Sequence, residues 1–424
     1  MKIEEVTEEI TEKVILIGVS LQENDDTEDS LEELAELVQT AKAQVVGKAI
    51  QSRDHIHPGT YVGKGKLEEL KEMLWETEAT GIVCDDELSP AQLRNMEEAL
   101  ECKVMDRTLV ILDIFAARAS TREGKIQVEL AQLKYRMSRL TGLGVSLSRL
   151  GGGIGTRGPG EKKLEMDRRL IKSRIAQLNR ELDQVRRHRE VARGQRERNQ
   201  TKVAAIVGYT NAGKSTLLNQ LTSAAVLEED KLFATLDPVT RNLKLDSGQE
   251  ILLTDTVGFI RKLPHHLIEA FRSTLEEAKY ADMIIHVVDA SNPQREQQMQ
   301  IVYETLKNLG ISGKKILTLF NKQDKIEEGE LLKDFQADRT LKVSARTGEG
   351  MDLLKESLEE ILREEKQFLE GTFPYEQASQ IAVIRKYGEL LEESYEADGI
   401  YVKAFVPAES YRNLTENMRA GESI

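Results

Sequence analysis

The stretch GYTNAGKS, residues 208–215, decides the fold expected for this chain. It fits the phosphate-binding pattern GxxxxGK followed by Ser or Thr, and it lies between the apolar segment VAAIV at 203–207 and a segment of helical spacing. In this pattern, backbone N–H groups of the loop and of the helix N-terminus bind phosphates, Lys214 contacts the terminal phosphates, and the Ser215 hydroxyl binds Mg²⁺. The stretch predicts a nucleotide site in an α/β domain without naming the base.

Short apolar segments alternate with helical stretches on both sides of this loop. The alternation predicts α/β architecture with a doubly wound, mostly parallel sheet around the loop. Its further expected strands are ILLTD at 251–255, MIIHVVD at 283–289, KILTLFN at 315–321 and LKVSA at 341–345. Near the start of the chain we expect strands at 13–19, 43–50 and 81–84 and helices at 30–41, opened by Ser30, and at 91–100, with Ser89 as N-cap.

The fold class expected is multidomain α/β, and four parts follow from these patterns. They are an N-terminal α/β subdomain at 1–115, a basic helical hairpin with a glycine-rich loop at 116–199, a nucleotide-binding domain around the phosphate loop at 200–365 and a small C-terminal α/β domain at 366–424. The last part shows an apolar segment at 380–386, an expected helix around 387–395, a turn at Asp398-Gly399, the apolar segment IYVKAFV at 400–406 and a final helix.

The net charge is unevenly distributed. The chain holds 59 Lys and Arg against 73 Asp and Glu, a net charge of −14, which argues against nucleic-acid binding. Residues 117–200, however, hold 21 Lys and Arg against 9 Asp and Glu, so this segment carries +12 and the remainder −26. Charge alone leaves open whether the basic segment binds RNA or is a solvated helical surface.

The basic segment has the pattern of two paired helices. We expect a long helix whose apolar seam packs on a partner at 124–137, the seam being Leu164, Ile171, Ile175, Leu178, Leu182 and Val185. Between them lies an expected glycine-rich loop at 150–163. Its GxGxxG match at 153–158 does not indicate NAD or FAD, because no buried strand precedes it and Pro159-Gly160 follows it.

Further motifs predict that the site binds guanine and a magnesium ion. The carboxylate of Asp324, in NKQD at 321–324, can accept from two adjacent N–H groups of guanine, which adenine does not offer. Asp255, Ser215 and Thr235 are the expected Mg²⁺ ligands, and Lys214, Thr235 and Gly258 the expected catalytic groups. The expected contacts to GTP or GDP are Gly208, Tyr209, Thr210, Asn211, Ala212, Gly213, Lys214, Ser215, Phe233, Ala234, Thr235, Leu236, Asp237, Asp255, Thr256, Val257, Gly258, Asn321, Lys322, Gln323, Asp324, Ser344, Ala345 and Arg346.

The order of these motifs resembles the translation-factor-type GTPases, with one departure. After DTVG stands Phe259, where Ras-like enzymes have a glutamine that orients the attacking water. An aromatic ring cannot orient a water by hydrogen bonding, so we expect slow unaided hydrolysis. The resemblance to the Era, Obg and TrmE branches also implies that Asn211 contributes to a K⁺ site near the phosphates.

The whole chain resembles the HflX family of bacterial GTPases. The resemblance is carried by RLGGGIGTRGPGEKKLEMDRR at 149–169, HPGTYVGKGKLEEL at 57–70, DRTLVILDIFAARASTREGKIQVELAQLKY at 106–135 and the GTPase motifs. It implies binding to the 23S rRNA and proteins of the large (50S) ribosomal subunit near the peptidyl transferase centre, and splitting or rescue of stalled or stressed ribosomes. The residues we expect to touch RNA are Arg149, Arg157, Lys162, Lys163, Arg168 and Arg169.

Two other functions stay open beside this one. The first is a ribosome biogenesis or hibernation factor that uses the same contacts, and the second is a signalling switch or an ATP-dependent RNA remodeller, which NKQD disfavours. The two cysteines, Cys84 and Cys102, form no disulfide framework, and no apolar run approaches the roughly 18 residues of a spanning helix. We expect a cytoplasmic monomer with no membrane insertion and no DNA partner.

Overall fold

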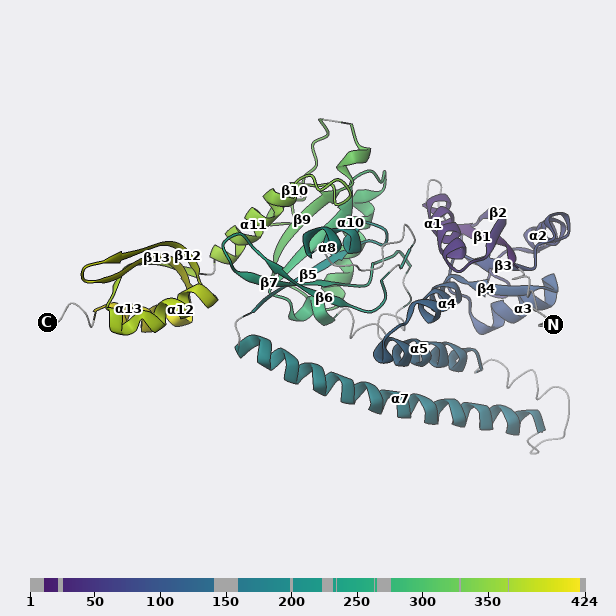
Figure 1. The fold of residues 1–424 in the computed structure, drawn as a ribbon. Helices are drawn as coiled ribbons and strands as arrows, with labels where there is room; N and C mark the ends of the chain where they lie inside the picture. Colours follow the sequence, from purple (N-terminus) through teal and green to yellow (C-terminus); the bar gives the residue numbers. More distant parts are fainter. Residues whose placement is uncertain are drawn as a thin grey trace, which may run out of the picture. The chain divides into compact units, whose positions relative to one another are not determined.

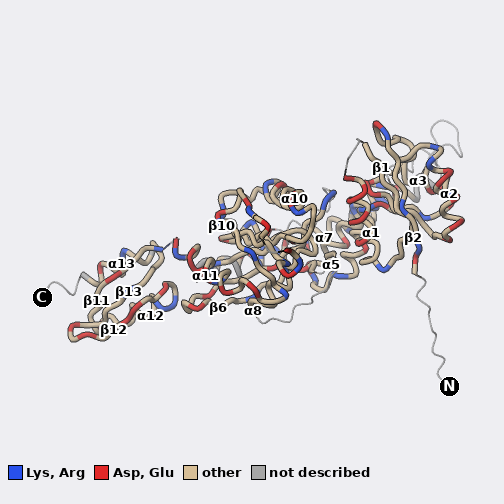
Figure 2. Tube along the Cα trace, turned by 90° about the horizontal axis from the view of Figure 1, so that it is seen from above, with Lys and Arg blue, Asp and Glu red and all other residues tan. Residues whose placement is uncertain are grey.

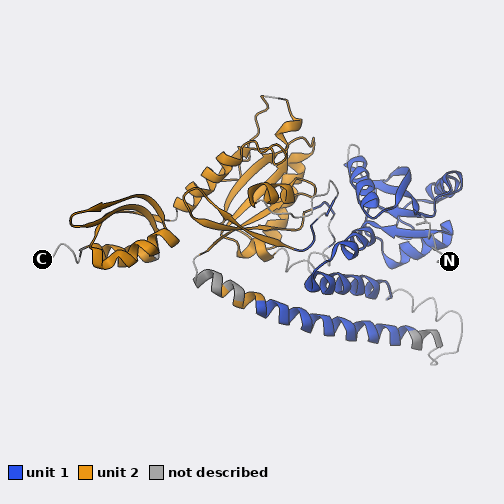
Figure 3. Ribbon diagram, viewed as in Figure 1, with its two compact units in different colours: residues 1–188, 229–237, 260–273 blue, residues 189–228, 238–259, 274–424 orange. Residues whose placement is uncertain are grey.

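The computed structural model describes residues 11–21, 26–140, 159–198, 201–222, 232–233, 235–262, 264, 276–327, 329–364 and 366–419 (Figure 1). Its contacts divide the chain into two compact units (Figure 3). The first contains residues 1–188, 229–237 and 260–273, and the second contains 189–228, 238–259 and 274–424. From the sequence we expect one continuous nucleotide-binding domain at 200–365. By contacts, two segments from within that range, 229–237 and 260–273, belong to the same unit as the N-terminal residues.

The N-terminal sheet is parallel, with strand order β2-β1-β3-β4. Its strands are β1 Lys13–Ser20, β2 Gln44–Ser52, β3 Gly81–Cys84 and β4 Lys103–Asp106, and its helices are α1 Thr27–Thr40, α2 Lys64–Thr77, α3 Pro90–Leu100 and α4 Arg107–Arg118. Six successive residues of β1 are buried, as a strand covered on both faces requires. The N-cap predicted at Ser89 is confirmed, with a complete capping box to Gln92.

The expected start of the first helix at Ser30 is wrong. The helix α1 begins one turn earlier, at Thr27, and Ser30 lies buried inside it. The Ser30 hydroxyl donates to Asp85 at 2.8 Å, a residue 55 positions away, so its role is a tertiary contact that local capping rules do not anticipate.

Two helices follow in the basic segment, α5 Arg122–Leu140 and α7 Pro159–Arg198. They pack together as expected, with Leu133 and Ile175 beside a buried cluster of Ile126, Leu130, Leu178 and Leu182. The helix α7 already begins at Pro159, so the expectation of loop through 163 is corrected: proline is compatible with the first turn of a helix. Residues 141–158, with the glycine-rich stretch, lie outside the described residues.

The second unit contains a six-stranded sheet of order β10-β9-β8-β5-β7-β6. Its elements are β5 Lys202–Gly208, α8 Lys214–Thr222, β6 Val239–Lys244, β7 Glu250–Asp255, β8 Met283–Asp289, α10 Arg295–Asn308, β9 Lys315–Asn321, β10 Arg339–Lys342 and α11 Met351–Glu364. All pairs except the antiparallel β6–β7 are parallel, which confirms the doubly wound class. The edge strand β6 was not expected, since only one of its six residues is fully buried.

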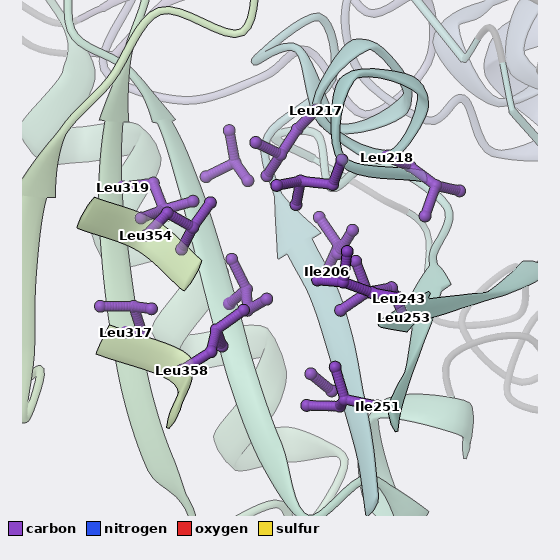
Figure 4. Close-up of a cluster of buried hydrophobic side chains, with 14 of the residues drawn as sticks. Ile206, Leu217, Leu218, Leu243, Ile251, Leu253, Leu317, Leu319, Leu354 and Leu358 are labelled. Carbon is purple, nitrogen blue, oxygen red and sulfur yellow. The ribbon is translucent and has the colours of Figure 1, made fainter. Parts of the chain in front are cut away.

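Alternating residues of β5 face two hydrophobic layers. Ala204 and Ile206 lie in a buried cluster with Leu217 and Leu218 of α8 and with residues of α11 (Figure 4). Val203, Ala205 and Val207 belong to a second cluster, which includes Val302 of α10. Because the strand is covered on both sides, its carboxyl end, where the phosphate loop begins, is fixed in position.

A small antiparallel sheet of order β11-β13-β12 ends the chain. Its elements are β11 Lys366–Phe373, α12 Ala378–Tyr387, β12 Glu389–Glu396, β13 Gly399–Pro407 and α13 Ala408–Arg419. The expected helix around 387–395 is wrong, because this segment is mostly strand and the apolar stretch before it is helical. Ile381 and Ile384, three residues apart, are buried on one face of α12. Among the described helices, none has the length and apolar character needed to span a membrane.

Candidate nucleotide-binding site

The phosphate loop runs from the end of β5 into the first turn of α8, as predicted. Gly213 has φ +94°, and a Cβ there would lie 2.3 Å from Nδ2 of Asn321. That nitrogen donates to the carbonyl oxygen of Ala212 at 2.8 Å, so the loop is in direct contact with the NKQD motif. Asn211 also has a positive φ of 61°, which asparagine tolerates better than most residues.

Lys214 is held within this loop. Its side chain is 7% exposed, and Nζ donates to the carbonyl oxygen of Tyr209 at 2.8 Å. Burial lowers the pKa of Lys214 to about 8, although Asp255 acts to raise it. A phosphate entering the loop would supply the negative charge that a buried ammonium lacks, and would raise this pKa.

This pKa gives a testable pH dependence. With a pKa of about 8, Lys214 in the free protein loses its proton as pH rises through this range, and we expect nucleotide binding to restore it. We therefore expect GDP affinity to fall by up to about tenfold per pH unit above pH 8, with uptake of about one proton at pH 9. Calorimetry in buffers of different ionisation enthalpy measures the uptake.

The matched control for this titration is Lys366→Gln. Burial lowers the pKa of Lys366 to about 8 as well, but this residue lies at the start of β11, outside the GTPase motifs. The variant should keep the proton uptake of the wild type. Binding at pH 9 without proton uptake would contradict the assignment to Lys214.

Two of the expected magnesium ligands are adjacent. Oγ of Ser215 donates to Oδ2 of Asp255 at 2.7 Å, which places a hydroxyl at the start of α8 beside a carboxylate at the end of β7. Oxygen donors of this kind are those that Mg²⁺ prefers, so the residues present fit the ion. Bound there, Mg²⁺ would neutralise charge on the phosphate oxygens.

The segment after β7 packs closely on the phosphate loop. A Cβ at Gly258 would lie 2.8 Å from Cγ2 of Thr210 and 2.9 Å from Nζ of Lys214, so only glycine fits without displacement. Phe259 follows with its ring 2% exposed in a hydrophobic cluster. Its backbone N–H donates to Gly208 and its carbonyl accepts from Thr210, at 3.0 and 2.8 Å. The Phe259 side chain therefore packs in the hydrophobic core beside β5.

The base-recognition motifs also meet. Oδ1 of Asn321 accepts from the Ala345 N–H at 2.9 Å, and Oγ of Ser344 donates to Asp324 at 2.7 Å. The Ser344 hydrogen bond holds the pKa of Asp324 below its ordinary value, so this carboxylate is ionised and able to accept hydrogen bonds. Lys322 has φ +64° and pairs with Asp289 at 2.8 Å. The motifs 208–215, 255–258, 321–324 and 344–346 thus all lie in the second compact unit.

The segment around Thr235 has different neighbours. It belongs to the first unit, where Asp237 accepts hydrogen bonds from Ser120 and Thr121. Ala234 lies outside the described residues. Ser120 and Thr121 are not among the residues predicted from the sequence. The only signal is a Ser-Thr pair ahead of α5, which is typical of a helix cap and does not reveal its distant partner.

Of the six residues expected to touch RNA, Arg168 and Arg169 have side chains that the structure describes. Arg149 and Arg157 lie outside the described residues, as do the side chains of Lys162 and Lys163. Arg168 is half-buried on α7, and Arg169 is exposed and 4.0 Å from Glu165.

The fold and these motifs define a P-loop GTPase, and three family matches agree. Residues 28–116 match a family described as GTP-binding GTPase N-terminal, 118–196 the GTP-binding GTPase middle region, and 203–322 the 50S ribosome-binding GTPase family. The chain is 65% identical to GTPase HflX of Lacrimispora saccharolytica over 97% of both chains, and 42% identical to GTPase HflX of Escherichia coli over 83% of both. The chain belongs to the HflX family and hydrolyses GTP to GDP and phosphate.

A solved structure is also similar. It is a GTP-binding protein from Sulfolobus solfataricus in complex with GDP, 26% identical, with a TM-score of 0.44, covering 82% of this chain and 98% of that one.

Proposed function

We propose that this GTPase binds the large ribosomal subunit, is activated by it, and splits or rescues stalled or stressed ribosomes. The observation that carries the proposal is Phe259, a buried aromatic residue that follows DTVG where Ras-like enzymes have the glutamine that orients the attacking water. The described motifs bind nucleotide, but the residue after Gly258 offers no polar group to the attacking water. An external activator supplies that function, and intrinsic turnover is slow.

Within the site, each group has a defined task. Lys214 and the loop amides stabilise the terminal phosphates, the Gly258 amide approaches the γ-phosphate, and Asp324 binds guanine. Ser215, Asp255 and Thr235 hold Mg²⁺. GTP orders the segments at Thr235 and Gly258 and favours the subunit-bound form, and hydrolysis releases it. We also propose that Asn211 contributes to a K⁺ site near the phosphates. The protein acts in the cytoplasm as a monomer.

The basic hairpin supports an RNA partner. Residues 117–200 carry +12 in a chain of net charge −14, and the Lys and Arg residues described on α5 and α7 are marked in Figure 2. Those proposed to contact rRNA are Arg149, Arg157, Lys162, Lys163, Arg168 and Arg169. Contacts of this kind release counterions from RNA, so subunit affinity should fall steeply with salt.

The test is GTP turnover with and without purified 50S subunits. We expect at least about tenfold stimulation, because the activator supplies transition-state stabilisation that Phe259 does not. Unchanged turnover would refute the mechanism. Light scattering of intact ribosomes with protein and GTP then separates splitting, which lowers the signal, from a biogenesis or hibernation role, which does not.

Charge reversal in the hairpin sharpens this experiment. Arg157→Glu should weaken 50S binding and lower its salt dependence by about one unit of slope or more. Arg412→Glu is the control with the same change of charge, since Arg412 is an exposed arginine of α13, outside the basic hairpin, that pairs with Glu416. Equal 50S affinity of the two variants would reject the RNA contact at Arg157 while leaving the turnover result intact.

A further inference from the structure

The carboxylate of Asp237 is held by four hydrogen bonds. It accepts from the backbone N–H and Oγ of Ser120, at 3.0 and 2.8 Å, and from the backbone N–H and Oγ1 of Thr121, at 2.9 and 2.5 Å. These four bonds fix the position of the Asp237 carboxylate, two residues after Thr235.

This contact lies at the start of α5, and a glycine makes room for it. Oγ1 of Thr121 accepts from the Gly124 N–H at 2.9 Å, and a Cβ on Gly124 would lie 2.3 Å from Oδ1 of Asp237. Glycine inside a helix costs about 1 kcal/mol relative to alanine, so its presence here is explained by the approaching carboxylate.

A second contact lies on the other side of Thr235. The ring of Phe233 is 2% exposed and meets Phe115 edge to face, with the ring centres 4.7 Å apart. Thr235 thus lies two residues after one anchor and two residues before the other. Since two residues span at most about 7 Å, Thr235 cannot move far unless one anchor is released.

We propose that Asp237 is a positioning residue for the GTP-bound state, acting through Thr235. Held on Ser120 and Thr121, it restricts the conformations open to Thr235, so that less conformational entropy is lost when Thr235 binds the metal ion of Mg·GTP. The inference rests on the proposed role of Thr235 as a magnesium ligand. GDP lacks the γ-phosphate that draws this segment to the metal, so the anchor should increase affinity for GTP over GDP. By linkage, GTP binding in turn favours the contact at the start of the hairpin helix α5.

The test is Gly124→Ala, which displaces the Asp237 carboxylate without altering any residue of the GTPase motifs. We expect affinity for a non-hydrolysable GTP analogue with Mg²⁺ to fall about tenfold and GDP affinity to stay within twofold. In EDTA, the variant and the wild type should bind the analogue equally.

The matched control is Gly65→Ala, a glycine in the first turn of α2 with no atom within 4 Å of the added Cβ. It should bind both nucleotides as the wild type does. An unchanged or increased analogue affinity in Gly124→Ala, or equal losses for GTP analogue and GDP, would overturn the positioning role.

A second variant separates this inference from the assignment on which it rests. Thr235→Ala should lose analogue affinity at least as strongly as Gly124→Ala. If Thr235→Ala binds the analogue normally, the magnesium assignment of Thr235 has failed, and the positioning role falls with it. If only Gly124→Ala binds normally, the assignment stands and the positioning role alone is refuted. Neither readout uses ribosomes, so a failure of 50S activation is a distinct result.

Discussion

Replacing Gly213 with alanine is expected to reduce the affinity for both GDP and GTP at least about 100-fold, or roughly 2.8 kcal/mol. The added Cβ would lie 2.3 Å from Nδ2 of Asn321, which is closer than non-bonded atoms approach, and φ at Gly213 is +94°. Either the loop or Asn321 must move. Because Asn321 bonds both Ala212 and Ala345, its movement would disturb the phosphate and guanine contacts together.

The control for this variant is Gly248→Ala. Gly248 has a similar φ of +83°, in the same compact unit, but no atom lies within 4 Å of an added Cβ. It therefore reports the cost of backbone strain without a steric clash. Calorimetric titration with GDP should give a near-normal dissociation constant for Gly248→Ala and one raised at least about 100-fold for Gly213→Ala. Comparable affinities would show that the contact with Asn321 is dispensable.

The elements that sequence analysis predicted correctly are those whose signal is local. Continuous apolar runs identified β1, β3, β5 and β8, since strands buried on both faces need no polar alternation. The edge strand β6 and the strand β12 were missed for the opposite reason. Half of the residues in each strand are exposed and only one is fully buried, and pairing with β7 and β13 decides their structure.

The same division applies to the site. The phosphate loop, DTVG, NKQD and SAR were predicted from the sequence because each motif carries its chemistry within a few residues. Contacts between distant segments were not. Ser120 and Asp237 are 117 residues apart, and Arg107 bonds Glu33 across 74 residues, so no periodicity or spacing connects them. Such pairs become visible only when the fold brings the segments together.

Replacing Arg107 with leucine is expected to destabilise the N-terminal sheet by about 3–5 kcal/mol. The Arg107 side chain is 1% exposed and donates to Asp85 at 2.8 Å, to Glu33 at 2.6 Å and to the Ser30 carbonyl at 2.8 Å. Asp85 is fully buried, and Arg107 and Lys262 lower its pKa against the effect of burial. Because its folded pKa is depressed, Asp85 contributes stability that is lost as pH falls through that pKa.

The stability lost in Arg107→Leu is measured by hydrogen exchange of the β1 and β3 amides, as a reduced free energy of opening. Arg94→Leu is the control, because Arg94 is partly exposed and makes only a 3.9 Å pair with Glu98 on its own helix, for which about 0.5 kcal/mol or less is expected. The double variant Arg107→Leu with Asp85→Asn should recover part of the lost stability, since it removes one of the buried charges that the single variant leaves without its arginine. If Arg107→Leu lowers the free energy of opening no more than Arg94→Leu does, the ion pairs of Arg107 contribute no stability beyond packing. The stability of the N-terminal sheet would then come from its apolar layers alone.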